Sequence, residues 1–117
     1  MAVRGATQVG ANDSQEILEA TGELVAEVMA RNNLTPRDVI SVLFTTTPDL
    51  NAAFPAEAAR RADFRDVPLM CATEIDVPGA PERIVRLLAH VDVERPRFAV
   101  RHVYLRGATV LRRDLAQ

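Results

Sequence analysis

The spacing of apolar and polar residues along the chain predicts strands that alternate with helices. The two-residue alternation of half-buried strands, or a short apolar β-branched run, occurs at residues 2–9, 39–46, 69–77 and 100–105. Helical spacing of apolar residues, or a proline suited to a helix start, occurs at residues 14–31, 55–61 and 81–95.

Two of the predicted helix starts carry capping residues. Asp13 and Glu16 approximate a capping box ahead of the first helix, which should run to about Arg31. Thr35 and Pro36 suit the start of a short helical turn before the second strand.

The third helix is predicted from the residues that follow Pro81. Pro78 and Gly79 end the preceding strand, and a proline suits the first turn of a helix. The expected apolar stripe consists of Ile84, Leu87, Leu88 and Val91. Arg86 lies off the centre of this stripe, and spacing alone favours a surface pair with Glu82 over a functional role.

This order of elements predicts an α+β or α/β sandwich, with helices packed on one side of a mixed β-sheet. The 117 residues contain no internal repeat, linker or low-complexity segment, so residues 1–117 should form a single domain. A domain of this size is small for a pocket that closes around a ligand. An interface between copies of the chain would supply the missing wall.

Composition excludes several classes of function. The net charge is −2 with the two signs interspersed, and aromatic residues make up 4% of the chain, so we expect no nucleic-acid partner. Cys71 is the only cysteine, which excludes an intrachain disulfide and a thiolate zinc cluster. His90 and His102 are too far apart in sequence to form a metal motif, so neither a metal nor another cofactor is expected.

The chain also lacks the patterns of a membrane or exported protein. No apolar run is long enough to span a bilayer, and Arg4 lies in a strand-like run and not in a signal-peptide pattern. We therefore expect no membrane partner and a cytoplasmic location.

All 14 basic residues are arginines. The absence of lysine excludes Schiff-base and lysine-base chemistry and favours planar, bidentate binding of carboxylate or phosphate. A general preference for arginine in the source genome is the plainer explanation.

Several polar or aromatic residues need partners. Arg4 lies among small and β-branched residues of a strand, and Glu74 lies inside or at the end of another, where burial is costly without a partner or a wet pocket. The sequence pattern also assigns no partner to Tyr104. Phe54 precedes a helix, where an apolar ring is most often a hydrophobic staple.

Four segments together resemble the trimeric, barrel-like class of chorismate mutases. They are VRGAT, TPDLNAAFPAEAAR, C-x-x-E-x-D-V-x-G and RHVYL-x-x-A-x-x-LR-x-DL, in the order and spacing of that family. The similarity covers nearly the whole chain. It implies a mixed sheet with helices on one side, three copies joined into a pseudo-α/β barrel, and rearrangement of chorismate to prephenate in phenylalanine and tyrosine biosynthesis.

The resemblance also implies roles for individual residues. Arg86, on the predicted helix, would reach the ether oxygen and a carboxylate of the substrate. Glu74 would accept a hydrogen bond from the ring hydroxyl, with Cys71 beside it. Arg4 and Tyr104 would bind substrate carboxylates. Residues that would contact the substrate or close the pocket are Phe54, Arg60, Thr73, Leu111 and Arg112. Across the interface, Phe54, Arg60, Cys71 and Glu74 of one copy would face Arg4, Arg86 and Tyr104 of another.

Two points depart from this pattern. Glu57 stands where the family often has a lysine, which removes a cation near the pocket mouth. Strict strand alternation also places Cys71 and Glu74 on opposite faces, so the strand must bulge, twist or end between them if both line one pocket.

Two other functions are weighed against this one. A small trimeric imine deaminase-like enzyme has a similar fold but lacks the TPDL, FPA and C-x-x-E pattern. A non-catalytic carboxylate-binding regulatory trimer would need no reactive site, and the joint presence of Arg4, Glu74, Arg86 and Tyr104 argues against it.

Overall fold

The computed structural model describes residues 1–111 of the chain. Within residues 1–111, five strands and two α-helices make up the fold: β1 Ala2–Gln8, α1 Ser14–Arg31, β2 Val39–Thr46, α2 Ala56–Arg61, β3 Leu69–Thr73, β4 Ile84–Val91 and β5 Val103–Tyr104. The same residues contain three short 3₁₀ helices: η1 Pro36–Asp38, η2 Arg97–Ala99 and η3 Arg106–Val110.

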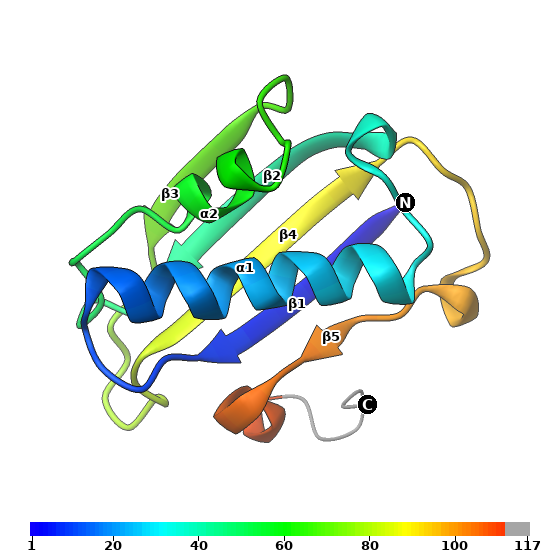
Figure 1. The fold of residues 1–117 in the computed structure, drawn as a ribbon. Coiled ribbons are helices and arrows are strands. Elements are labelled where there is room, and N and C mark those ends of the chain that lie inside the picture. Colours follow the sequence, from blue (N-terminus) through cyan, green and yellow to red (C-terminus); the bar gives the residue numbers. More distant parts are fainter. Residues whose placement is uncertain (112–117) are drawn as a thin grey trace.

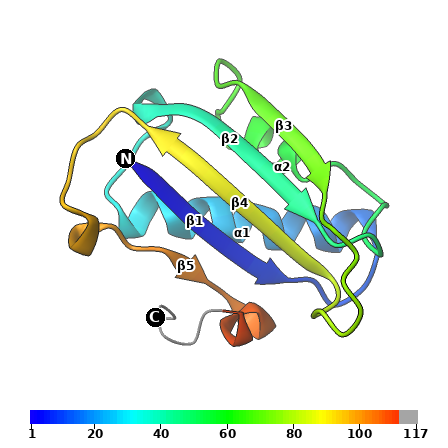
Figure 2. The ribbon, with the colours of Figure 1, turned by 180° about the vertical axis from the view of Figure 1, so that it is seen from behind.

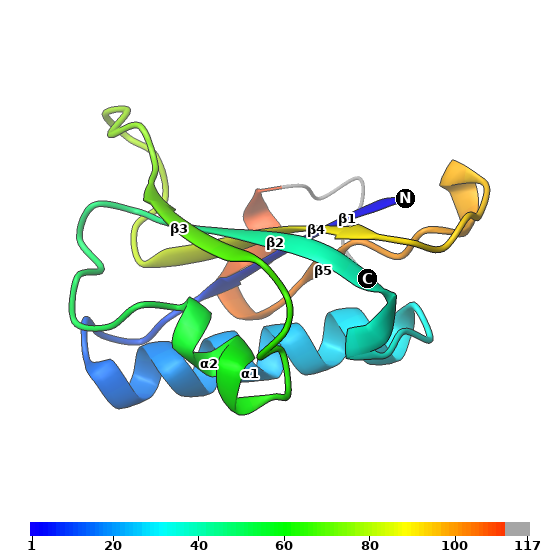
Figure 3. The same ribbon diagram turned by 90° about the horizontal axis from the view of Figure 1, so that it is seen from above.

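The strands form one mixed sheet in the order β3-β2-β4-β1-β5. β4 pairs antiparallel with β1 and β2, whereas β5 and β3 add parallel strands at the two edges. Both α-helices cover the same face of this sheet (Figures 1 and 3). The predicted fold, a mixed sheet with helices on one side, is confirmed.

The opposite face of the sheet is crossed by no α-helix within residues 1–111 (Figure 2). We call it the open face. It carries one small apolar cluster under η3, made of Ala6, Ile84, Tyr104 and Ala108. Elsewhere its side chains are half-buried or exposed, for example Leu43, Leu88 and Met70.

Helix α1 lies against the covered face because its apolar stripe matches the strands beneath it. Leu24, Val25 and Val28 pack with Val3 of β1 in the main core. Gly5 allows this approach, since a Cβ there would lie 3.1 Å from side-chain carbons of both Leu24 and Val28. Asp13 caps the helix as expected, accepting from the backbone N–H of Glu16 at 3.1 Å.

The predicted third helix is wrong, because residues 84–91 form the central strand β4. The apolar residues of this segment fit both the period of a helix and the two-residue period of a strand, and its β-branched residues favour a strand. In the structure Val85, Leu87, Ala89 and Val91 are buried on the covered face, in strict alternation. Arg86 therefore lies on a strand, and Glu82 pairs with Arg83 and not with Arg86.

The last two predicted strands are shorter than expected. β3 ends at Thr73 and not near Val77, and the last strand contains only Val103 and Tyr104. η2 and η3 flank this strand, because the chain turns after Pro96 and again after Leu105. None of the helices within residues 1–111 is long and apolar enough to cross a membrane.

Candidate active site

Four residues from four strands form a row across the open face. Thr45 of β2 pairs with Arg86 of β4, Arg86 pairs with Ala6 of β1, and Ala6 pairs with Tyr104 of β5. Residues that pair across neighbouring strands point to the same face of a sheet. Arg86 and Tyr104 therefore lie on either side of Ala6 in this row, and Ala6 and Tyr104 are buried in the small cluster under η3.

Glu74 reaches this row from the segment after β3. Its backbone N–H donates to the carbonyl of Thr46 at 2.8 Å, so its main chain continues beside β2. Its carboxylate oxygen Oε2 accepts from Thr45 Oγ1 at 2.7 Å and from Arg86 Nε at 3.1 Å. A cavity of about 450 Å³ is lined by Glu74 and Arg86 together with residues of two loops.

The Arg86–Glu74 ion pair is partly open to solvent. The Glu74 side chain is 18% exposed and the Arg86 side chain is 43% exposed. Only Nε of Arg86 is bonded to a residue within 1–111, so both terminal guanidinium nitrogens remain available to a ligand. Arg86 is thus the cation that this cavity offers to a ligand, and the carboxylates of its lining are Asp49, Glu74, Asp76 and Glu82.

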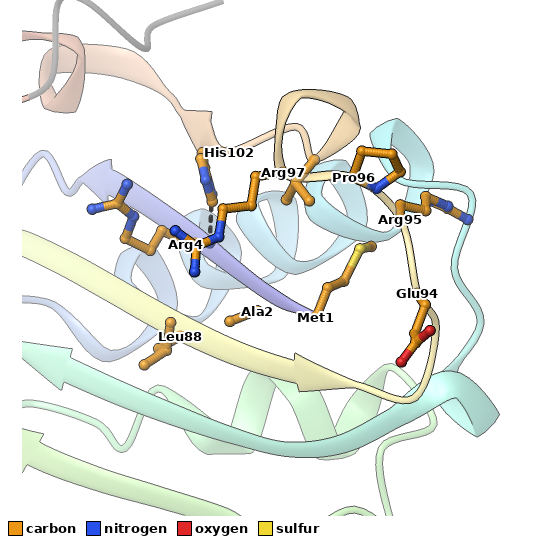
Figure 4. A pocket seen from close by; sticks show the side chains of 10 residues that line it. Met1, Ala2, Arg4, Leu88, Glu94, Arg95, Pro96, Arg97 and His102 are labelled. Carbon is orange, nitrogen blue, oxygen red and sulfur yellow. Dashed lines mark hydrogen bonds between the residues drawn. The ribbon is translucent and has the colours of Figure 1, made fainter.

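Arg4 lies one row away on the same face. It pairs with Leu88, and its backbone N–H donates to His102 Nδ1 at 3.0 Å. Its guanidinium forms no ion pair with residues 1–111. Figure 4 shows the side chain extending along β1 toward the strand's C-terminal end, which is the direction of the Ala6 row.

Arg4 also lines a cavity of about 800 Å³, together with Arg95 and Arg97 (Figure 4). Arg95 is already engaged, because its Nη1 donates to the carbonyl of Asn32. Arg97 has no ion pair with the described residues. Arg4 therefore lines this basic cavity, and its side chain extends from there toward the row that contains Arg86.

Cys71, Thr73 and Phe54 line a different cavity, of about 380 Å³, beside α2. Cys71 pairs with Phe44 and Thr73 with Thr46, which places both on the face that the helices cover. The Phe54 side chain is 74% exposed at the entrance to α2. Cys71 and Glu74 lie on opposite faces, as strand alternation predicts: Cys71 pairs with Phe44 on the covered face, and the Glu74 carboxylate bonds to Thr45 and Arg86 on the open face.

Arg60 lies on the outer side of α2, next to Glu57. Its Nη1 lies 3.3 Å from Glu57 Oε2, and Arg61 Nε lies 3.5 Å from Glu57 Oε1. All three side chains are largely exposed. Glu57 thus neutralises part of the positive charge of α2.

Leu111 follows η3 and packs against the cluster that contains Tyr104. Tyr104 is nearly buried there. The proposed contact residue Arg112 lies outside the described residues. The segment that includes Leu111 therefore reaches the end of the row on the β5 side.

The expected grouping of residues across a subunit interface stays a prediction. Within one chain, the Glu74 carboxylate bonds to Arg86. Sequence reasoning also missed Thr45. A run of three hydroxyl side chains, Thr45 to Thr47, at the end of an apolar strand was the available signal.

A metal centre finds no support in the described part of the chain. No group of three or more His, Cys, Asp or Glu residues within 1–111 has the geometry to hold a metal ion. The site instead pairs one carboxylate with a guanidinium and leaves a second guanidinium unpaired nearby.

Comparison with known proteins identifies a family. Residues 1–115 match the family model for chorismate mutase type I. The chain is 39% identical over 115 residues to chorismate mutase AroH of Bacillus subtilis (strain 168), covering 97% of this chain and 91% of the relative. It is 43% identical over 114 residues to chorismate mutase AroH of Thermus thermophilus, with 97% and 93% covered.

A solved structure shows the same fold. A chorismate mutase from Clostridium thermocellum superposes with a TM-score of 0.92 at 45% sequence identity. The match covers 94% of this chain and 98% of the other.

Proposed function

The chain belongs to the chorismate mutase type I family, and from this premise we propose how and where it converts chorismate to prephenate. The activity itself is that of a chorismate mutase, an isomerase of aromatic amino acid biosynthesis. The two alternatives, an imine deaminase-like enzyme and a non-catalytic regulatory trimer, are not supported by the comparisons.

The ion pair between Arg86 and Glu74 carries the proposed mechanism. In this rearrangement the C–O bond breaks as the new C–C bond forms, so the ether oxygen gains negative charge and the ring gains positive charge. The terminal nitrogens of Arg86 would donate to the ether oxygen, and Glu74 would accept from the ring hydroxyl on the other side. Fixed charges that match the transition state lower the barrier without any proton transfer.

The remaining cations would hold the substrate in its compact, reactive conformer. Arg4 has no ion-pair partner within residues 1–111 and extends toward the same row, so it would bind one carboxylate of chorismate. Tyr104, beyond Ala6 in that row, would bind the other end. Binding in one conformer brings the reacting carbons together and removes much of the entropic barrier. No cofactor is required for this step.

We further propose that three copies of the chain form the active unit, each site being shared between two of them. One chain places Phe54, Cys71 and Thr73 on one side of the sheet and Arg86 on the other, so a single chain holds two incomplete halves. Phe54, Arg60, Cys71 and Thr73 of one copy would complete the site of the next, with Leu111 and Arg112 closing it.

The open face supports this assembly. It exposes apolar side chains, including Met70 with 69% of its surface accessible, and no α-helix in residues 1–111 covers it. Apolar sheet faces of this kind are normally buried against another layer. We propose that the layer is the sheet of a neighbouring copy, and that the enzyme works in the cytoplasm, where its pathway supplies chorismate.

The activity and the site are tested together by following the loss of chorismate absorbance with the wild-type chain and with Arg86→Ala, and by identifying prephenate as the product. The wild-type chain should turn chorismate over, and Arg86→Ala should lower kcat by at least about 10²-fold, the usual loss for one transition-state donor. Wild-type activity combined with an unchanged Arg86→Ala variant would refute the proposed site. A wild-type chain with no activity would refute the proposed function.

A further inference from the structure

We propose that Thr45 is a positioning residue for the reaction, because its hydroxyl orients the Glu74 carboxylate toward the substrate. The inference rests on the proposed function, since that function gives Glu74 its role. Thr45 itself need not touch chorismate.

The contacts of Glu74 show why an orienting group is needed. Thr45 Oγ1 and Arg86 Nε both donate to the same oxygen, Oε2, at 2.7 and 3.1 Å. Oε1 accepts from no residue within 1–111. Two donors on one oxygen fix the plane of the carboxylate and leave Oε1 with free lone pairs for the ring hydroxyl.

The position of Thr45 is itself well determined. It pairs with Arg86 on one side and with Ala72 on the other, in the interior of the sheet. Its β-branched side chain has few rotamers on a strand, so the hydroxyl has little freedom to move. The next residue, Thr46, accepts from the backbone N–H of Glu74 at 2.8 Å. One short piece of β2 therefore holds both the main chain and the carboxylate of Glu74.

Without this hydroxyl, Arg86 would be the only side chain within residues 1–111 that bonds to the carboxylate. The same guanidinium must also point its terminal nitrogens toward the substrate. Any movement of the flexible Arg86 side chain toward the substrate would then also move the Glu74 carboxylate. Thr45 separates them, since the carboxylate keeps its orientation while Arg86 adjusts to the ether oxygen.

Three variants test the proposal by steady-state kinetics. Thr45→Val keeps the shape and removes the donor, and it should lower kcat by roughly tenfold, the value of one hydrogen bond to a charged group. Thr45→Ser keeps the donor and should retain activity within about threefold, since only a methyl group is lost. Thr7→Val is the matched control, because the Thr7 hydroxyl is buried without a hydrogen-bond partner in residues 1–111, and activity should be unchanged.

A double-mutant cycle separates positioning from a general structural role. In a Glu74→Ala background the hydroxyl has no carboxylate to orient, so Thr45→Val should cause no further loss of kcat. Equal losses in the wild-type and Glu74→Ala backgrounds would overturn the proposal, as would a Thr45→Val enzyme with wild-type kcat. If the wild-type chain lacked chorismate mutase activity, the proposed function would fail first, and this inference with it.

Discussion

Arg86 and Glu74 lie 12 residues apart in the sequence and form an ion pair on the open face, with Nε 3.1 Å from Oε2. Glu74 follows the edge strand β3 and Arg86 lies in the central strand β4, so β2 stands between their strands. Thr45 of β2 bonds to the same carboxylate oxygen. In the proposed mechanism, these two groups would match the opposite charges that the rearrangement develops, and they already contact each other in the structure.

The first prediction separates the charge of Arg86 from its shape. Arg86→Lys keeps the positive charge but loses the planar guanidinium that bonds Glu74 through Nε and offers two further nitrogens. Activity should fall by about 10²-fold or more, mainly in kcat, because the lost contacts form in the transition state. Steady-state kinetics on the folded variant measures this.

Arg61→Lys provides the control for that substitution. Arg61 is exposed on α2 and contacts only Glu57 among the described residues, at 3.5 Å. Its replacement should leave kcat within about twofold, as exposed ion pairs contribute little. An Arg86→Lys enzyme with wild-type kcat would show that Arg86 is not the catalytic cation.

The second prediction concerns assembly. Met70→Glu places a charge on the exposed apolar part of the open face, where it costs the isolated chain little. If this face is buried between copies, the variant should dissociate from trimer to monomer and lose activity, because a buried unpaired charge is strongly destabilising. Light scattering with an activity assay measures both. As a control, Ala26→Glu on the exposed side of α1 should remain trimeric. A wild-type chain that is monomeric at assay concentration would contradict the proposal that each site is shared between two copies.

Much of the fold could be predicted from the sequence, because local signals and periodicity agreed. The first helix has a capping aspartate, a long amphipathic stripe and an end at Arg31, and the structure has all three. The segment 84–91 could not be assigned in this way, since its apolar residues satisfy both periods. Pairing with β1 and β2 on both sides decided its structure, and such pairing is not local information.

The same limit applies to the site. Glu74 and Arg86 were identified through the family resemblance, but their contact depends on β4 being a strand beside β2. With Arg86 placed on a helix, no pairing with Glu74 follows, and Thr45 has no visible role. Strand parity did predict correctly that Cys71 and Glu74 face opposite sides.

The third prediction concerns pH. The proposed reaction transfers no proton, so kcat should be nearly constant across neutral pH. The pH–rate profiles of the wild-type enzyme and of His90→Gln measure this. His90 lies near Ser41, at the opposite end of β4 from Arg86, which contacts Glu74. Its replacement should therefore not change the profile. A bell-shaped profile centred near neutrality would indicate an acid or base and another mechanism.

The last prediction concerns Glu57, which stands where the family often has a lysine. In the structure its carboxylate holds Arg60 at 3.3 Å and Arg61 at 3.5 Å, so Arg60 must leave an ion pair before it binds an anionic substrate. Glu57→Gln removes the ion pair that competes with the substrate for Arg60, together with one negative charge beside Arg60. The KM for chorismate should fall by roughly two- to fivefold with kcat little changed, since an exposed pair is worth only ~0.2–1 kcal/mol. The stability of the variant should change by less than ~0.5 kcal/mol. Glu27→Gln, which breaks a similar pair with Arg31 on α1, should leave KM unchanged. A KM that rises in Glu57→Gln would mean that Glu57 positions Arg60 for the substrate and does not compete for it.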